Sequence, residues 1–283
     1  MNAIFLLLTI FALSMQSILQ KQYNTIGKKL SVFGFNALSA AAAFLFFALL
    51  SGGSFTLHTP TLIYAVFFGI AYLTTMVSCV LSIRYGSLSL FSLAISYSLL
   101  LPTLYGILFL KESAKPSLYI GLALFLLSIL LINFNKNDTK ISAKWVVFTL
   151  LAFLGNGLCT ILQKQQQMEA GGAYKSEFMM TALLLAALGS LLLTLCFEKK
   201  LFCPSVRKGW HLAALCGLCN GGVNLLVMTL CTTMPASLLF PLVSAGGIVT
   251  TFFVSRFVYK ETLSRTQLLG FCIGVGSIIA LNI

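Results

Sequence analysis

Long apolar segments separated by short polar stretches run along almost the whole chain. A helix that crosses a bilayer needs about 20 mostly apolar residues, and ten segments approach or exceed that length. The loops between them leave almost no chain for a soluble domain. The pattern therefore predicts an all-α integral membrane protein with ten transmembrane helices, at residues 3–22, 30–50, 61–83, 88–110, 117–134, 144–167, 176–197, 209–231, 236–259 and 266–282.

The two halves of the chain repeat each other at several ordered positions. A single match would carry little weight in so apolar a sequence, but the matches keep the same order and the same number of helices per half. The offsets are 143 for residues 18–22 with 161–165 (Ile-Leu-Gln-Lys-Gln), 148 for Gly69 with Gly217, and 149 for Lys111-Glu112 with Lys260-Glu261, Gly121 with Gly270 and Ser128 with Ser277. The slow drift of the offset requires only small insertions.

An odd number of helices per half decides how the halves are oriented. Residues 1–135 form the first five-helix repeat, residues 136–143 a polar linker, and residues 144–283 the second repeat. If the first half enters the membrane from one side, the second must enter from the other. We therefore predict an inverted 5+5 structural repeat, an architecture of secondary transporters whose binding site lies near the middle of the membrane.

Composition agrees with a membrane protein and gives it an orientation. Of the 283 residues, 59% are hydrophobic and 8% are charged, with 18 Lys+Arg against 6 Asp+Glu. This balance excludes a soluble enzyme and a nucleic-acid module. The loops after helices 1, 3, 5, 7 and 9 hold 14 basic residues, and the opposite side holds only Lys111, Lys115, Lys164 and Lys175. By the positive-inside rule, both termini should face outside.

One pattern near the end of each half resembles the EamA-like branch of the drug/metabolite transporter (DMT) superfamily. The first copy reads Arg84-Tyr-Gly-Ser, a helix with Pro102, then Leu110-Lys-Glu112 and Gly121, and the second has Pro241, Lys260-Glu261 and Gly270. The resemblance covers nearly the whole chain. It implies a multi-pass transporter of a cell membrane, here a bacterial plasma membrane, with helices 1, 3, 4, 6, 8 and 9 around a central cavity. Better-known members have cytoplasmic termini, unlike the orientation expected here.

No acidic residue is predicted inside the hydrocarbon core. The six acids, at helix ends or in loops, are Glu112, Asp138, Glu169, Glu177, Glu198 and Glu261. The small multidrug branch of the superfamily carries a glutamate in its first helix, and this chain has none there. Because intramembrane carboxylates commonly relay protons, their absence favours neutral, zwitterionic or anionic substrates. Glu112 and Glu261 are each predicted to cap the helix that follows.

Polar side chains inside the predicted helices form faces that a substrate can contact. Each face also has a packing interpretation, since amides, hydroxyls and small residues join helices in lipid. Amides and hydroxyls suit carboxylate, amine or sugar groups. The cavity candidates are Gln16, Gln20, Tyr72, Ser96, Tyr97, Asn156, Thr160, Gln163, Asn220, Asn224 and Ser244.

Two lysines and two prolines have separate interpretations. Lys21 and Lys164 lie late in their helices, where each can snorkel to the interface or, alternatively, gate one mouth of the cavity or attract an anion. Pro102 and Pro241 lack an amide hydrogen and are predicted to kink their helices. The CxxC formed by Cys216 and Cys219 has no second pair, so no metal site is expected.

The sequence thus predicts a secondary active transporter that moves a small polar organic metabolite, amino acid-like or another zwitterionic or neutral solute, by alternating access. No phosphate-binding GxxxxGK[ST] loop is present, so a gradient or counter-substrate would drive it. A multidrug or organic-cation exporter stays an alternative because of the 24 Phe, 9 Tyr and 8 Met. Further alternatives are a nucleotide-sugar-like exchanger and a non-transporting membrane protein. The expected partners are a small-molecule substrate and the lipid bilayer, with no nucleic acid, cofactor or enzymatic activity. The sequence leaves the oligomeric state open, and a monomer is compatible with it.

Overall fold

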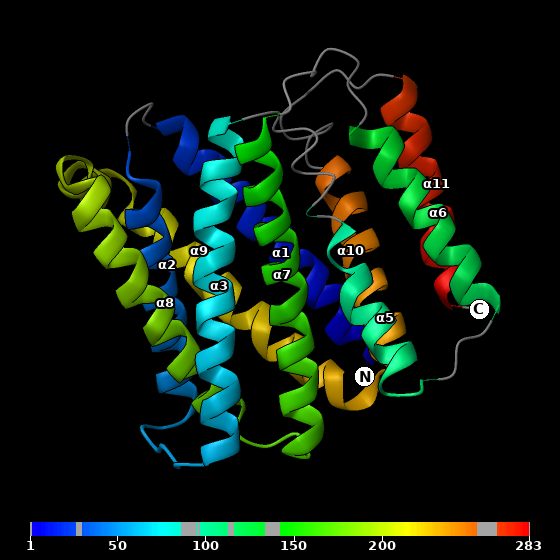
Figure 1. Cartoon of the computed structure of the whole chain (residues 1–283), viewed down its shortest axis with the longest axis horizontal. Helices are drawn as coiled ribbons and strands as arrows, with labels where there is room; N and C mark the ends of the chain where they lie inside the picture. The colour runs from blue at the N-terminus through cyan, green and yellow to red at the C-terminus, as the bar shows by residue number, and fades with distance from the viewer. Residues whose placement is uncertain are drawn as a thin grey trace. The chain divides into compact units, whose positions relative to one another are not determined.

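All the regular structure in the described part of the chain is helical. The computed structural model describes residues 2–26, 30–85, 95, 97–112, 116–133, 142–253 and 265–282. These residues contain ten helices and no strand (Figure 1). The helices are α1 (Asn2–Ile26), α2 (Val32–Leu50), α3 (Thr59–Tyr85), α5 (Leu100–Leu108), α6 (Pro116–Asn133), α7 (Ala143–Glu169), α8 (Lys175–Phe197), α9 (Lys199–Thr233), α10 (Ala236–Phe253) and α11 (Arg265–Asn282).

The prediction of an all-helical membrane protein is confirmed. Six of the described helices are long and apolar enough to cross a membrane, namely α1, α2, α3, α7, α8 and α9. Most helices begin and end within about four residues of the apolar segments, because the same apolar run that favours lipid also favours an unbroken helix. Much of the fourth predicted segment lies outside the described residues, and α5 covers its last part.

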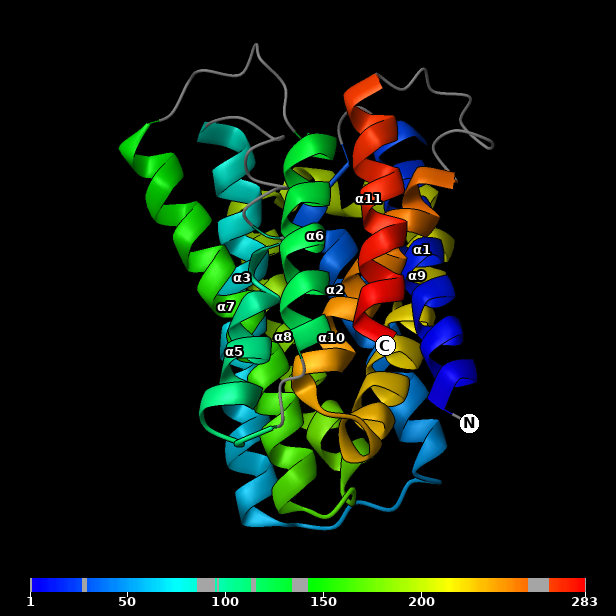
Figure 2. The same ribbon diagram turned by 90° about the vertical axis from the view of Figure 1, so that its right-hand side faces the viewer.

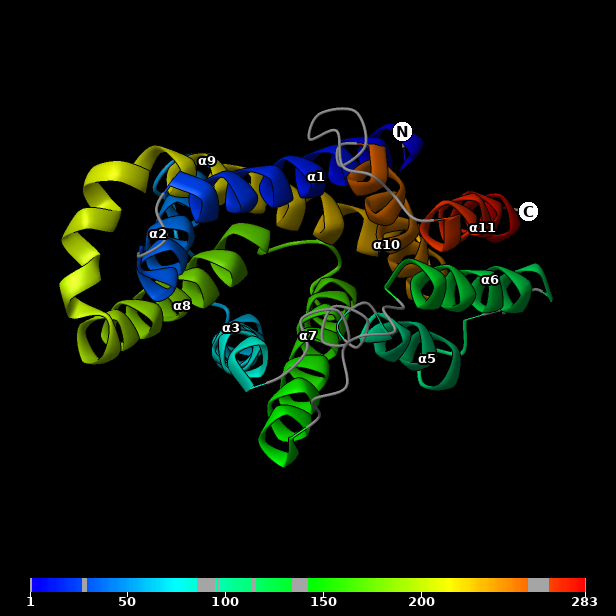
Figure 3. The ribbon, with the colours of Figure 1, turned by 90° about the horizontal axis from the view of Figure 1, so that it is seen from above.

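Helix α9 is longer than the sequence predicted. It was expected to begin at residue 209 but begins at Lys199, directly after Glu198 at the end of α8. Pro204 lies in this added part, where Figure 3 shows a sharp bend. Proline removes one backbone hydrogen bond and clashes with the preceding turn, which bends a helix. Hydropathy failed to find the added turns because it detects the part of a helix that suits lipid, and this part is polar.

Helices from both halves of the sequence combine into two compact units. Unit 1 comprises Met1–Leu73 and Leu162–Thr232, and unit 2 comprises Thr74–Ile161 and Thr233–Ile283. The divisions fall inside α3 and α7, so each of these helices contributes to both units. The spatial units therefore do not follow the division of the sequence into two halves.

In unit 2, α6 and α11 lie side by side and run in opposite directions (Figure 2). The Ser128 hydroxyl donates to the Gly270 carbonyl oxygen at 2.7 Å, and the Ser277 hydroxyl donates to the Gly121 carbonyl oxygen at 3.0 Å. The later residue on each helix thus faces the earlier residue on the other, so the two helices are antiparallel. Hydroxyl and glycine contacts of this kind hold helices together in lipid.

In unit 1, α2 packs against α8, and α9 approaches α2 very closely at Gly217. A Cβ atom at Gly217 would overlap the Ser39 carbonyl oxygen and would lie 2.7 Å from the Ala42 Cβ. Glycine is required there because the backbones of the two helices almost touch.

Gly69 makes the corresponding approach between α3 and α8. A Cβ atom at Gly69 would lie 3.2 Å from the Ala182 carbonyl oxygen and 3.1 Å from the Leu185 Cβ. This approach is tight, but it is less close than the approach at Gly217.

Two half-buried carboxylates cap helix N-termini. Glu198 accepts hydrogen bonds from the Ser31 hydroxyl at 2.6 Å and the Phe33 amide at 3.1 Å, at the start of α2. Glu112 accepts from the amides of Ala236 at 2.7 Å and Ser237 at 2.9 Å, at the start of α10. A carboxylate suits the positive end of a helix dipole.

The prediction that Glu112 caps the helix that follows it is therefore corrected. It caps α10 instead of α6, because tertiary packing brings the first amides of α10 to its carboxylate. Sequence order alone does not reveal that neighbour. Glu261 lies outside the described residues.

Replacing Glu112 by glutamine should lower the free energy of unfolding by about 1 kcal/mol, since the uncharged amide interacts more weakly with the α10 N-terminus. Chemical unfolding of the detergent-solubilised protein measures the loss. Glu169→Gln is the control, because that exposed carboxylate caps none of the described helix N-termini, and its effect should stay within about 0.5 kcal/mol. Equal losses in the two variants would contradict the capping role.

Candidate functional site

A chain of three amide side chains joins α7 to α9 in unit 1. Gln163 Nε2 donates to Asn224 Oδ1 at 2.6 Å, and Asn224 Nδ2 donates to Asn220 Oδ1 at 3.0 Å. Gln163 is only 4% exposed, and the two asparagines are half-buried. Asn224 lies about 14 Å before the end of α9 at 1.5 Å per residue, about half the thickness of a hydrocarbon core. Amides at that depth need polar partners, and the chain supplies them.

The two ends of this amide chain differ in chemistry. Asn224 uses its oxygen toward Gln163 and its NH₂ group toward Asn220. An amide has one acceptor oxygen and two donor hydrogens. Within the described part of the chain, Gln163 therefore retains its Oε1 acceptor and Asn220 retains its Nδ2 donors. A solute with a donor group at one end and an acceptor group at the other matches this order.

The Lys164 ammonium is buried against the C-terminal end of α9. Its Nζ donates to the Cys231 carbonyl oxygen at 2.8 Å, and the residue is 5% exposed. The last carbonyls of a helix lack intrahelical donors and carry partial negative charge, which a cation stabilises. Lys175 Nζ donates to the Thr229 hydroxyl at 3.2 Å near the same end. The α9 carbonyl thus holds the Lys164 side chain within the protein, close to the end of that helix.

Two further glutamines at the end of α7 are buried and were missed by the sequence candidates. Gln166 Nε2 donates to the Thr61 hydroxyl at 3.2 Å, and Gln167 Nε2 donates to Gln166 Oε1. Gln167 Oε1 is buried with no partner among the residues that the structure describes. A signal was present, because residues 163–167 read Gln-Lys-Gln-Gln-Gln. A membrane helix with polar side chains on several faces must have each of those faces covered by protein rather than lipid.

The candidates of unit 2 form a separate set. Asn156 Nδ2 donates to the Ser98 hydroxyl at 2.6 Å, and the Tyr97 hydroxyl donates to a carbonyl oxygen of α6 at 3.3 Å. The Thr160 hydroxyl donates at 2.8 Å to a carbonyl oxygen of its own helix. Ser244 is half-buried in α10. Asn156 thus joins α7 to the turn before α5, whereas Thr160 satisfies its hydroxyl locally.

The remaining described candidates lie on α1 and α3. Gln16 is half-buried and Gln20 is exposed on α1. Tyr72 stacks on Phe68, with ring centroids 6.0 Å apart. Ser96 and the Lys21 side chain lie outside the described part of the structure.

The two prolines are placed differently in their helices. Pro102 lies in the first turn of α5, just after a turn at Ser98 and Leu99, so the helix is interrupted there rather than kinked. Proline cannot donate the hydrogen bond that would join it to the preceding turn, which explains the interruption. Pro241 lies inside α10, and its predicted kink stays a prediction.

Comparison with known proteins agrees with this fold. Helices that span a membrane and join through buried amides define a multi-pass membrane protein with a polar interior. Residues 143–283 match the model of the EamA-like transporter family. This half of the chain belongs to that family, which confirms the resemblance found in the sequence. The match indicates a membrane transporter of the drug/metabolite type.

A solved structure, titled "Crystal structure of protein", is similar to this chain over nearly its full length. The similarity covers 99% of this chain and 95% of the other, with a TM-score of 0.78 and 16% sequence identity. At that identity the likeness concerns the fold alone. No curated protein matches the chain.

Proposed function

We propose that the protein is a secondary active transporter that moves a small polar organic metabolite, amino acid-like or another zwitterionic or neutral solute, by alternating access. The observation that carries this proposal is the amide chain of Gln163, Asn224 and Asn220, which presents donors and acceptors without net charge. The described acids all lie at helix ends, in the α5–α6 loop or between α8 and α9. A site of this kind favours neutral and zwitterionic solutes over bare cations.

We further propose that the two halves form an inverted 5+5 repeat. Support comes from the reciprocal bonds between α6 and α11, where Ser128 bonds to Gly270 and Ser277 bonds to Gly121. Adding the repeat offset of 149 to Ser128 and Gly121 gives Ser277 and Gly270, so the two halves exchange the same contact. Exchange of this kind is the property of a two-fold axis. The antiparallel run of these two helices supports opposite orientations of the halves.

The glycine contacts in unit 1 give independent support for the repeat. Gly69 and Gly217 are repeat mates, and their neighbours are related too. Adding the early offset of 143 to Ser39 and Ala42, which lie against Gly217, gives positions 182 and 185, which lie against Gly69. An inverted repeat provides two equivalent conformations that open to opposite sides, which is the basis of alternating access.

We also propose that both termini face outside a bacterial plasma membrane. The support is the concentration of 14 of the 18 basic residues on the other side of the predicted helices, since basic residues are retained in the cytoplasm.

Zwitterionic solutes should raise the melting temperature of the purified wild-type protein, because a ligand that binds only the folded state stabilises it by mass action. The panel contains amino acids, sugars, nucleotide sugars and lipophilic cations. Asn224→Leu should abolish the shift, while Gln22→Leu should retain it, since Gln22 is an exposed amide on α1 outside the chain of amides. A shift with lipophilic cations alone would favour a multidrug exporter, and a shift with nucleotide sugars alone would favour an exchanger. Either result would overturn the proposal.

A further inference from the structure

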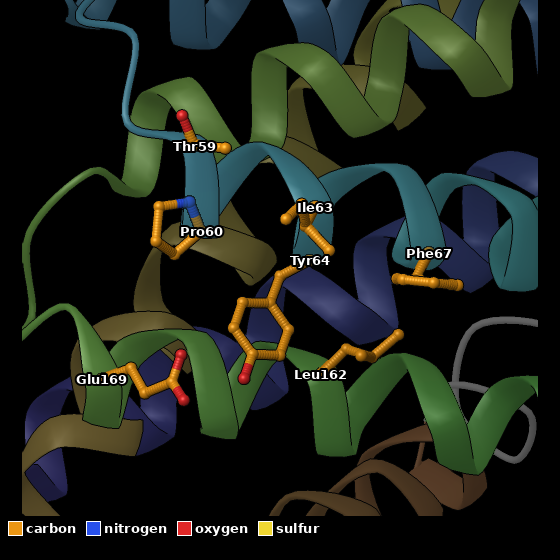
Figure 4. Close-up of a pocket in the computed structure, with 7 residues that line it drawn as sticks. All are labelled: Thr59, Pro60, Ile63, Tyr64, Phe67, Leu162 and Glu169. Atoms are coloured by element: carbon orange, nitrogen blue, oxygen red, sulfur yellow. The ribbon is translucent and has the colours of Figure 1, made fainter.

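Unit 1 has an open groove between α3 and α7, and none of the three residues of the amide chain lines it. Its volume is about 410 Å³, within the range of about 300–1,000 Å³ typical of small-molecule sites. Figure 4 shows side chains from the start of α3 on one wall and from the end of α7 on the other. The lining residues include Thr59, Ile63, Tyr64, Phe67, Leu162 and Glu169.

The groove changes from polar to apolar along its length. Thr59 begins α3 and Glu169 ends α7, and Figure 4 shows both at the same end of the groove. Phe67 and Leu162 lie about two turns closer to the middle of their helices, about 10 Å away at 1.5 Å per residue. The ends of membrane-spanning helices lie at the headgroup level and their middles lie in the hydrocarbon core. The groove therefore has the same order of polarity as a phospholipid.

The apolar wall of the groove is open to its surroundings. Ile63 is 51% exposed and Phe67 is 57% exposed. In a helix that spans a membrane, such side chains face acyl chains rather than water. In a membrane, an acyl chain would therefore lie along this wall.

The polar end of the groove is suited to a cation. Glu169 is exposed and is the last residue of α7, where the helix dipole is negative and a carboxylate is unfavourable. No basic side chain among the described residues forms an ion pair with it, although the chain carries a net charge of +12. A cationic group from outside the chain would neutralise both the carboxylate and the helix end.

We propose that this groove binds a phospholipid with a primary ammonium headgroup, phosphatidylethanolamine, with the ammonium on Glu169 and an acyl chain along Ile63 and Phe67. The three N–H donors of a primary ammonium can bond directly to carboxylate oxygens, as lysine does. The trimethylammonium of a choline lipid has no such donor, and an anionic headgroup is repelled by the carboxylate. This binding is independent of the transported solute, because it involves no residue of the amide chain.

Native mass spectrometry of the detergent-solubilised full chain tests this site. The protein is mixed with equal amounts of phosphatidylethanolamine, phosphatidylcholine and phosphatidylglycerol. Wild type should retain the ethanolamine lipid in preference to the other two. Glu169→Gln should reduce that preference about three- to fivefold, the effect expected of one partly exposed charge pair.

Glu177→Gln is the matched control, since Glu177 lies in the first turn of α8 and is outside the groove. It should keep the wild-type preference. A melting-temperature rise of wild type with ethanolamine lipid, reduced in Glu169→Gln, provides a second readout that does not depend on ionisation. Equal binding of ethanolamine and choline lipids by wild type, an unchanged preference in Glu169→Gln, or displacement of the lipid by a soluble organic amine would overturn the proposal.

Discussion

Replacing Gly217 by leucine should lower the free energy of unfolding by about 3 kcal/mol or more. A Cβ atom there overlaps the Ser39 carbonyl oxygen, and a backbone atom cannot rotate away as a side chain can. The helices α2 and α9 must then separate, which removes packing on both sides of the contact. Chemical unfolding of the detergent-solubilised protein measures the loss, and a fall in the monodisperse fraction on gel filtration should accompany it.

The same helix offers a matched control for this prediction. A Cβ atom at Gly222 would meet nothing within 4 Å, so Gly222→Leu should cost less than about 1 kcal/mol. Gly69→Leu should fall between the two, because a Cβ there would lie 3.1 Å from the Leu185 Cβ and 3.2 Å from the Ala182 carbonyl oxygen, so α3 and α8 need to separate less than α2 and α9 do. Equal losses at Gly217 and Gly222 would show that the close approach of α2 and α9 is not as described.

Replacing Lys164 by methionine should destabilise the protein by about 1–3 kcal/mol, although methionine is a better residue for an apolar helix. The change removes the donor that bonds to the Cys231 carbonyl oxygen, and a buried acceptor that loses a partner pays its desolvation cost. It also removes the cation at the negative end of α9. Thermal and chemical unfolding in the same detergent measure the effect.

Lys175→Met is the control for Lys164, because Lys175 is only half-buried and donates to a side-chain hydroxyl. Its loss should be below about 1 kcal/mol. If Lys164→Met were as stable as wild type, the buried lysine would not stabilise the end of α9.

The helices of this protein could be predicted well because the hydropathy of the sequence largely determines where they lie. The run of apolar residues at 176–197 predicts α8, observed at Lys175–Phe197, to within one residue. The failure at the start of α9 has the same origin, since the turns from Lys199 are polar and lie beyond the apolar run. Hydropathy identifies the part of a helix that is apolar enough to lie in lipid, and it does not identify a polar extension of the same helix.

The site was predicted only in part, since partners on other helices depend on packing. Asn220 and Asn224 could be paired from their spacing of four residues within one helix. Their link to Gln163 on α7 joins positions 61 residues apart, and no periodicity specifies which faces of α7 and α9 meet. The cap that Glu112 forms on α10 was missed for the same reason, because its partner amides are 124 and 125 residues away.

Counterflow in proteoliposomes tests the transport mechanism most directly. Vesicles loaded with an unlabelled amino acid mixture receive a trace of labelled amino acid outside, and entry of the label is followed with time. We expect the wild-type protein to give saturable uptake that exceeds the uptake of protein-free vesicles. Gln22→Leu should retain this uptake, and Asn224→Leu should reduce it at least tenfold. Uptake equal to that of protein-free vesicles for every solute of the panel, or a flux that rises linearly without saturation, would contradict a transporter of polar metabolites that works by alternating access.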